Sequence, residues 1–219
     1  MKRVATADMT VIAQPKIWKV FKNWGIATLM GIAAASHLRA VAVLAVVSLA
    51  SFLPGLFQIP PVDRDEPRFA QATKQMIETG DYVDIRFQDE TRYKKPVGIY
   101  WLQATAVEMA EAVGVSRAAT NIGIYRIPSL IGAIGAVLVT YWAALAFVSR
   151  RAALMAGAMM ATSILLGVEA RLAKTDAMLL LTTTAALGAI ALLHQIRARP
   201  ACLLWSLPRS FGVRSRPEF

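Results

Sequence analysis

The chain has 219 residues, of which 56% are hydrophobic and 17% are charged, and its formal net charge is +10. Soluble domains usually carry about 45–50% apolar and about 25% charged residues, so this composition argues against a soluble domain and for insertion into a lipid bilayer. One cysteine and two histidines exclude an intrachain disulfide framework and a cysteine–histidine metal cluster.

Four apolar segments organise the sequence. A helix needs about 20 residues to cross a hydrocarbon core of about 30 Å, because each residue rises 1.5 Å. The prolines at 60–61 end the first segment, since proline cannot continue the hydrogen-bond ladder. We therefore expect an all-α polytopic membrane protein with about four transmembrane helices. The expected spans cover residues 40–59, 122–148, 152–168 and 176–196.

The basic residues lie beside these segments rather than in a patch of their own. In short flanks, lysine and arginine mark the cytoplasmic side, so we read them as a topology signal and expect no nucleic acid partner. With four spans, the basic flanks fall on one side of the membrane. They contain Arg39, Arg150, Arg151, Arg197 and Arg199, besides five lysines and arginines before residue 30.

This topology divides the rest of the chain. Residues 1–39 are expected to form a cytoplasmic segment. Residues 197–219 are expected to form a cytoplasmic tail, which contains no apolar run and reads as disordered or as a non-native end. The loop 60–121 and the short turn 169–175 then face the outside, so we expect a multi-pass inner-membrane protein with a large periplasmic or extracellular loop.

The outer loop is itself predicted to be structured. A helix is expected over residues 66–79, with Asp65 as N-cap and Gly80 just past its end. A second helix is expected over residues 97–113, and Glu108 and Glu111 interrupt it, so we expect it to lie on the membrane surface without crossing.

The first polar cluster of the loop follows the first span directly. It runs from Asp63 to Arg68 and includes Asp65 and Glu66. A carboxylate at this place could accept the proton of an acceptor hydroxyl near a lipid-borne substrate. The alternative is structural: Asp65 caps the helix, and Asp63 pairs with Arg64 or Arg68.

Three further clusters combine cations with a membrane boundary. Lys94 and Lys95 suit a lipid phosphate, although snorkelling beside an interfacial helix would explain them as well. Arg126 begins the second span, where it is either a phosphate contact or an interfacial anchor. Arg171 and Asp176 flank the outer mouth of the fourth span, where Thr175 or Asp176 could instead cap a helix.

Together these motifs resemble the first periplasmic loop of ArnT-like glycosyltransferases. These enzymes belong to the wider family of dolichyl-phosphate-mannose–protein mannosyltransferases, which have the GT-C fold. The resemblance rests on the following motifs, in family order: Asp65-Glu66, Arg68-Phe69, Gly80-Asp81-Tyr82, Lys95-Pro96 with Tyr100-Trp101, Arg126-Ile127-Pro128-Ser129, and Arg171 with Thr175-Asp176.

The resemblance implies a function and its residues. A sugar would pass from a polyprenyl-phosphate donor to a lipid, glycan or protein acceptor at the outer face of the membrane. Asp65 would activate the acceptor hydroxyl, and Lys95, with Arg126, would bind the donor phosphate. Asp176 would be a second acidic residue near the site. The supporting residues would be Asp63, Glu66, Arg68, Lys94, Arg171 and Asp176.

Two departures qualify this expectation. Related enzymes often have a glutamate before the lysine that helps to bind a metal, whereas Lys94 occupies that place here, so no metal site is assigned. Family members also have many more spans, so we expect the N-terminal part of such an enzyme, as a truncated chain. A non-catalytic membrane fragment or scaffold is the alternative. A transporter or channel would need charges within its spans, and these are almost uncharged.

Overall fold

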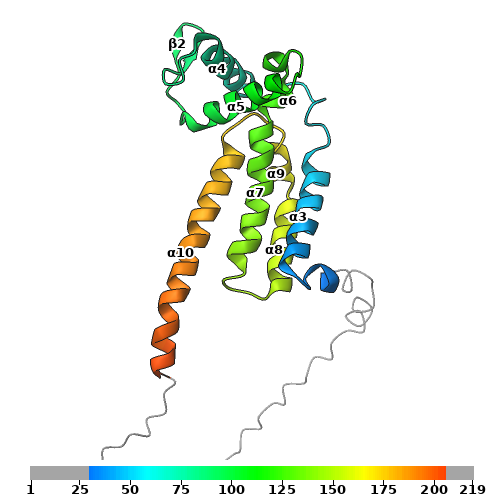
Figure 1. Cartoon of the computed structure of the whole chain (residues 1–219), viewed down its shortest axis with the longest axis vertical. Coiled ribbons are helices and arrows are strands. Elements are labelled where there is room, and N and C mark those ends of the chain that lie inside the picture. Colours follow the sequence, from blue (N-terminus) through cyan, green and yellow to red (C-terminus); the bar gives the residue numbers. More distant parts are fainter. Residues whose placement is uncertain (1–29, 206–219) are drawn as a thin grey trace, which may run out of the picture.

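The structure is a computed structural model that describes residues 30–205. The longer helices run along its long axis, and the elements of the loop after the first helix gather at one end, which we call the loop end (Figure 1). The elements, in chain order, are α3 (His37–Phe52), α4 (Glu66–Thr79), β1 (Arg86–Phe87), β2 (Glu90–Thr91), α5 (Gly98–Ala112), a 3₁₀ turn (Ala118–Thr120), α6 (Ile122–Tyr125), α7 (Ile127–Ala144), α8 (Arg150–Ala161), α9 (Ile164–Glu169) and α10 (Asp176–Trp205).

The first long helix is shorter than the apolar run that contains it. α3 begins at His37, where the Ser36 side chain accepts a hydrogen bond from the Arg39 backbone N–H. It ends at Phe52 and not at the predicted residue 59. The chain turns there because Pro54 has no N–H for the helix ladder and Gly55 adopts a left-handed φ of +84°.

The third predicted span is divided into two helices. α8 ends at Ala161 and α9 begins at Ile164, with Thr162 and Ser163 between them. The Thr162 hydroxyl donates back to the carbonyl of Ala158 at 3.0 Å. Such side-chain competition for backbone groups explains why the apolar run does not form one helix.

Within the described part of the chain, two helices are long and apolar enough to cross a membrane, namely Ile122–Ala144 and Asp176–Gln195, and α3 is apolar but has 16 residues. The protein is therefore mostly helical with membrane-spanning segments, as expected, while four spans remain a prediction. α10 continues to Trp205, so residues 197–205 are helical and not an irregular tail. The segments 1–29 and 206–219, for which cytoplasmic locations are predicted, lie outside the described residues.

Small residues allow α7 and α10 to lie close together. A methyl group at Gly132 would meet the Met178 backbone nitrogen at 2.9 Å, and one at Gly188 would meet the Trp142 ring at 2.8 Å. Close approach through glycine is typical of helix pairs in membranes, where van der Waals packing replaces the hydrophobic driving force.

At the loop end, α4 packs against α5. Phe69 stacks on Tyr100 with ring centroids 5.4 Å apart, and both side chains are buried. Gly80 ends α4 in the left-handed conformation, as predicted. The antiparallel strands β1 and β2 pair Arg86 with Thr91 and Phe87 with Glu90, and together they form a short hairpin.

Candidate functional site

The loop end is organised around a buried carboxylate, Glu66, at the start of α4. The Arg126 guanidinium contacts both of its oxygens, with Nε to Oε1 at 2.6 Å and Nη2 to Oε2 at 3.1 Å. The Ala173 backbone N–H also donates to Oε1, at 3.1 Å. Glu66 and Arg126 have no exposed side-chain surface. One side chain thus ties α4 to the start of α7 and to the turn before α10.

The Arg126 side chain is fully occupied by internal partners. Besides Glu66, its Nη1 donates to the carbonyl oxygens of Leu56 at 2.7 Å and Ile59 at 2.8 Å, and its Nη2 reaches that of Pro60 at 3.5 Å. A buried guanidinium with these partners has no free donor for a ligand. In this structure Arg126 anchors the chain that follows α3, and its role as a phosphate contact stays a prediction.

Asp65 lies beside this anchor but faces outward. Its side chain is about half exposed, and its Oδ1 lies 3.4 Å from Nη1 of Arg68. The Asp65 backbone is already helical, and the side chain makes no capping hydrogen bond to α4. Asp65 therefore occupies the predicted N-cap position, but its side chain does not cap the helix. Its carboxylate remains accessible.

Asp63 has a partner from another part of the chain. Its carboxylate pairs with the Lys174 ammonium, from the turn before α10, and not with Arg64 or Arg68. Arg171 also has internal partners, since its guanidinium donates to the carbonyl oxygens of Pro54 at 2.7 Å and of Gly167, and to that of Ser51. Arg171 thus supports the turn after α3.

A groove of about 730 Å³ opens between these segments. The residues that line it are Pro54, Ile59, Val62, Asp63, Val168, Glu169, Arg171, Leu172 and Lys174. Burial and the neighbouring Asp176 carboxylate raise the pKa of Glu169. Asp176 itself is exposed at the start of α10. The groove therefore brings acidic and basic groups together at the predicted outer mouth of the spans.

A run of cationic residues, Arg92, Lys94 and Lys95, precedes α5. Lys94 and Lys95 are exposed, and neither forms an ion pair within the part of the chain that the structure describes. Arg92 is partly buried: its Nε donates to the Tyr100 hydroxyl at 3.3 Å, and its guanidinium lies 5.4 Å from the centre of the Phe69 ring. Arg92 therefore fixes the backbone that leads to the two lysines.

The Asp65 carboxylate also acts electrostatically on Tyr100, which holds Arg92 before the lysine run. Burial raises the pKa of Tyr100, Arg92 opposes that effect, and the Asp65 carboxylate adds to it. The stacking of Phe69 on Tyr100 brings α4, which follows Asp65, against α5, which follows Lys95. The described residues show no direct contact between Asp65 and Lys95, so the structure places them on adjoining elements without joining them.

Sequence reasoning missed Lys174 as the partner of Asp63, and Arg92 and Tyr100 as the contacts that fix the lysine run. The spacing of the cation Arg92 and the aromatic residue Tyr100 is a signal in the sequence for their contact. No signal in the sequence indicates that Asp63 pairs with Lys174. Within residues 30–205, no group of three or more His, Cys, Asp or Glu side chains is placed to bind a metal ion.

The sequence is similar to three curated relatives. It is 28% identical, over 144 residues, to the undecaprenyl phosphate-alpha-4-amino-4-deoxy-L-arabinose arabinosyl transferase of Pectobacterium carotovorum, and equally to that of Pectobacterium atrosepticum. It is 26% identical over 171 residues to the transferase of the same name from Aeromonas salmonicida. The predicted resemblance to ArnT-like glycosyltransferases is therefore confirmed.

These matches cover 65%, 65% and 74% of this chain, but only 25%, 25% and 30% of the relatives. The chain thus spans less than a third of their length. No family model matches the sequence, and no solved structure matches it.

Proposed function

We propose that this chain carries the donor-side loop of a glycosyltransferase that uses a polyprenyl-phosphate sugar, as the names of its relatives suggest. The observation that carries the proposal is the arrangement at the loop end. An exposed carboxylate, Asp65, stands next to the buried Glu66–Arg126 pair. Two exposed lysines, Lys94 and Lys95, precede the adjoining helix α5 and form no ion pair with any residue between 30 and 205.

The proposed reaction divides the work between these residues. The Asp65 carboxylate takes the proton of the acceptor hydroxyl as its oxygen bonds to the anomeric carbon of the sugar. The bond from that carbon to the phosphate oxygen breaks, and the polyprenyl phosphate leaves with the electron pair. Negative charge grows on the phosphate in the transition state, so a cation already in place, Lys95, lowers the barrier.

An apolar groove supports a lipid-borne donor. It has a volume of about 480 Å³ and lies along α5, which follows Lys95 in the chain. Leu102, Met109 and Val113 of α5 line it together with Ile131 of α7 and Met178 of α10. Apolar walls of this kind suit the hydrocarbon tail of a polyprenyl phosphate.

Donor binding is tested first, with the purified chain in nanodiscs and undecaprenyl phosphate as the probe. Lys95→Ala is expected to weaken binding about tenfold, the loss of one charge-assisted hydrogen bond. Lys74→Ala is the matched control, because Lys74 is on α4 and pairs with Glu78 at 3.6 Å. Equal binding of undecaprenol and undecaprenyl phosphate by the parent chain would refute a phosphate site.

Transfer is tested second, as the release of undecaprenyl phosphate from a labelled donor in membranes. Asp65→Asn should reduce transfer by about 10²–10⁴-fold with donor binding unchanged, because it removes a general base. Near-normal transfer at equal abundance would defeat this assignment. A parent chain that binds the donor but never transfers the sugar would favour the alternative of a non-catalytic membrane fragment.

A further inference from the structure

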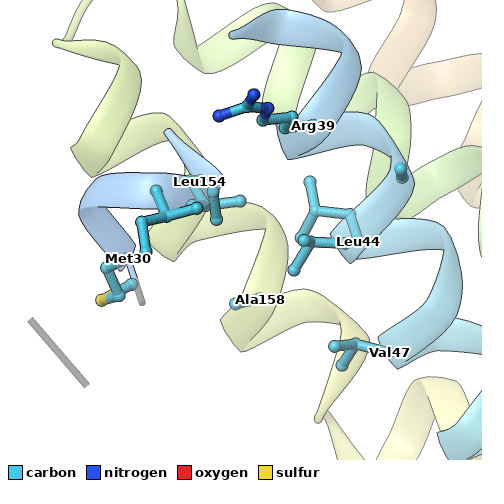
Figure 2. Close-up of a pocket in the computed structure, with 10 residues that line it drawn as sticks. Met30, Arg39, Leu44, Val47, Leu154 and Ala158 are labelled. Atoms are coloured by element: carbon cyan, nitrogen blue, oxygen red, sulfur yellow. The ribbon is translucent and has the colours of Figure 1, made fainter. Parts of the chain in front are cut away.

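An apolar groove lies away from the loop end, where α3 and α8 begin. It has a volume of about 560 Å³ and lies between these two helices and the segment 30–33 (Figure 2). Arg39 lies at one end of the groove, and Val47 lies at the other. Its lining residues are Met30, Ile32, Ala33, Arg39, Ala42, Val43, Leu44, Val47, Leu154 and Ala158. None of them belongs to the site proposed above.

Each helical wall of the groove begins with an arginine. On α3, Arg39 lies four residues before Val43, which itself lies four residues before Val47, so the three side chains share one face. On α8, Arg151 lies three residues before Leu154, which is followed on the same face by Ala158. We call the end with Arg39 and Arg151 the basic end.

Both arginines are exposed, and within the described residues neither forms an ion pair. Their neighbour Arg150, by contrast, forms hydrogen bonds within the protein. Its Nη1 donates to the carbonyl oxygens of Ala34 at 3.2 Å and Ala35 at 2.8 Å, so it attaches the segment before α3 to the start of α8. Arg150 is therefore engaged within the protein, whereas Arg39 and Arg151 are exposed to a ligand.

The helix termini add to the positive potential. α3 and α8 both begin at the basic end, and neither has an acidic residue in its first turn. The first N–H groups of a helix carry partial positive charge, which favours an anion nearby. α3 has 16 residues and is about 24 Å long, so Arg39 at its start lies where a side chain can reach a headgroup.

We propose that this groove binds an anionic diacyl phospholipid. The headgroup phosphate lies between Arg39 and Arg151, and one acyl chain lies along Leu44, Val47, Leu154 and Ala158. The volume is within the range of about 300–1,000 Å³ that ligand pockets have. Charge selects the lipid class and the apolar walls receive the tail, so a zwitterionic phospholipid binds more weakly. The inference is independent of the glycosyltransferase proposal.

The test uses the full chain, reconstituted in nanodiscs of defined lipid and released for native mass spectrometry. With equal amounts of phosphatidylglycerol and phosphatidylcholine, the parent should retain phosphatidylglycerol. Arg39→Gln with Arg151→Gln should weaken its retention about 25-fold, about fivefold for each arginine near an anionic headgroup. The matched control is Arg64→Gln with Arg117→Gln, because both arginines are exposed at the loop end.

Two more variants separate charge from shape and from folding. Ala158→Phe fills the groove and keeps both arginines, so it should reduce retention of every phospholipid. Arg39→Lys with Arg151→Lys keeps the charge and should retain phosphatidylglycerol, with far-ultraviolet circular dichroism as the check on folding. Equal retention of the two lipids by the parent would overturn the proposal. So would a photocrosslinker at Val43 that captures protein and not lipid, because a second copy or another helix would then cover the groove.

Discussion

Glu66 and Arg126 form the contact on which the loop end depends most. A buried ion pair is costly to break from one side, because the remaining charge stays buried without a partner. We expect Glu66→Gln to lower the free energy of unfolding by about 3–5 kcal/mol. The measurement is unfolding of the purified chain in mixed micelles, followed by tryptophan fluorescence.

The control for this prediction is Arg68→Gln, since Arg68 forms a half-exposed pair with the neighbouring Asp65. Exposed pairs contribute about 0–1 kcal/mol, so this variant should unfold almost as the parent does. The double variant Glu66→Gln with Arg126→Met should recover part of the loss, because it leaves no buried charge. Equal destabilisation by Glu66→Gln and Arg68→Gln would contradict the anchoring role of the pair.

Asp84 offers a titration that reports on the hairpin region. The Tyr93 hydroxyl, which donates to Asp84 at 2.5 Å, and the Arg86 guanidinium lower the pKa of this carboxyl below its ordinary value of 3.8. We expect Tyr93→Phe to raise the pKa of Asp84, as read by carboxyl-carbon NMR. Tyr82→Phe is the control, since the Tyr82 hydroxyl donates to Glu108 and not to Asp84.

The sign of the linked stability follows from this shift. The pKa of Asp84 in the folded chain lies below its unfolded value, so the contact stabilises the loop above the unfolded pKa. That stabilisation is lost as the pH falls through the folded pKa. An unchanged pKa of Asp84 in Tyr93→Phe would show that Tyr93 does not control this carboxyl.

At the scale of elements, the sequence predicted helices well and their ends less well. The apolar stripe of α4 and the glycine at its end are local signals, and the helix occupies residues 66–79 as expected. The end of α3 also had a local signal, Pro54-Gly55, which the high apolar content of the run obscured. The break between α8 and α9 lies at Thr162 and Ser163. The hydroxyl of such residues can bond to nearby backbone groups and so compete with the hydrogen bonds of a continuous helix.

The packing of α7 against α10 leads to a sharper prediction. Gly132→Ala would place a methyl group 2.9 Å from the backbone nitrogen of Met178, which cannot move as a flexible side chain could. We expect a loss of about 1–3 kcal/mol of stability, typical of overpacking. Gly98→Ala is the control, because nothing lies within 4 Å of its added methyl group. Equal stability of the two variants would mean that the helices separate freely.

At the scale of the whole molecule, the structure brings together the loops that the topology assigns to one side. Asp63 meets Lys174 at the loop end, and Arg150 meets Ala34 and Ala35 at the basic end. Arginine counts in the flanks are enough to predict which of these segments lie at the same end of the molecule. It could not predict the contacts themselves, because partners so far apart along the chain are chosen by packing and not by spacing.

The predicted sidedness is open to direct measurement. In a Cys202→Ala background, which removes the one native cysteine, we expect an impermeant maleimide to label Asp89→Cys and Ser116→Cys from outside. Val148→Cys should be labelled only after the membrane is opened. Labelling of Asp89→Cys and Ser116→Cys from opposite sides would mean that α5 crosses the membrane, and labelling of Asp89→Cys only from the cytoplasm would invert the topology.

The anchoring of Glu66 also constrains how the chain is made. Its partners lie 60 and 107 residues further along, at Arg126 and Ala173. Ribosomes add about 5–20 residues each second, so this carboxylate waits for seconds before the whole set of donors has been synthesised. Until then Glu66 remains hydrated, and the contact that joins α4 to the start of α7 cannot form. Nascent chains that stop before residue 126 should therefore carry a loop that proteases cut readily, whereas chains that extend past residue 176 should resist them.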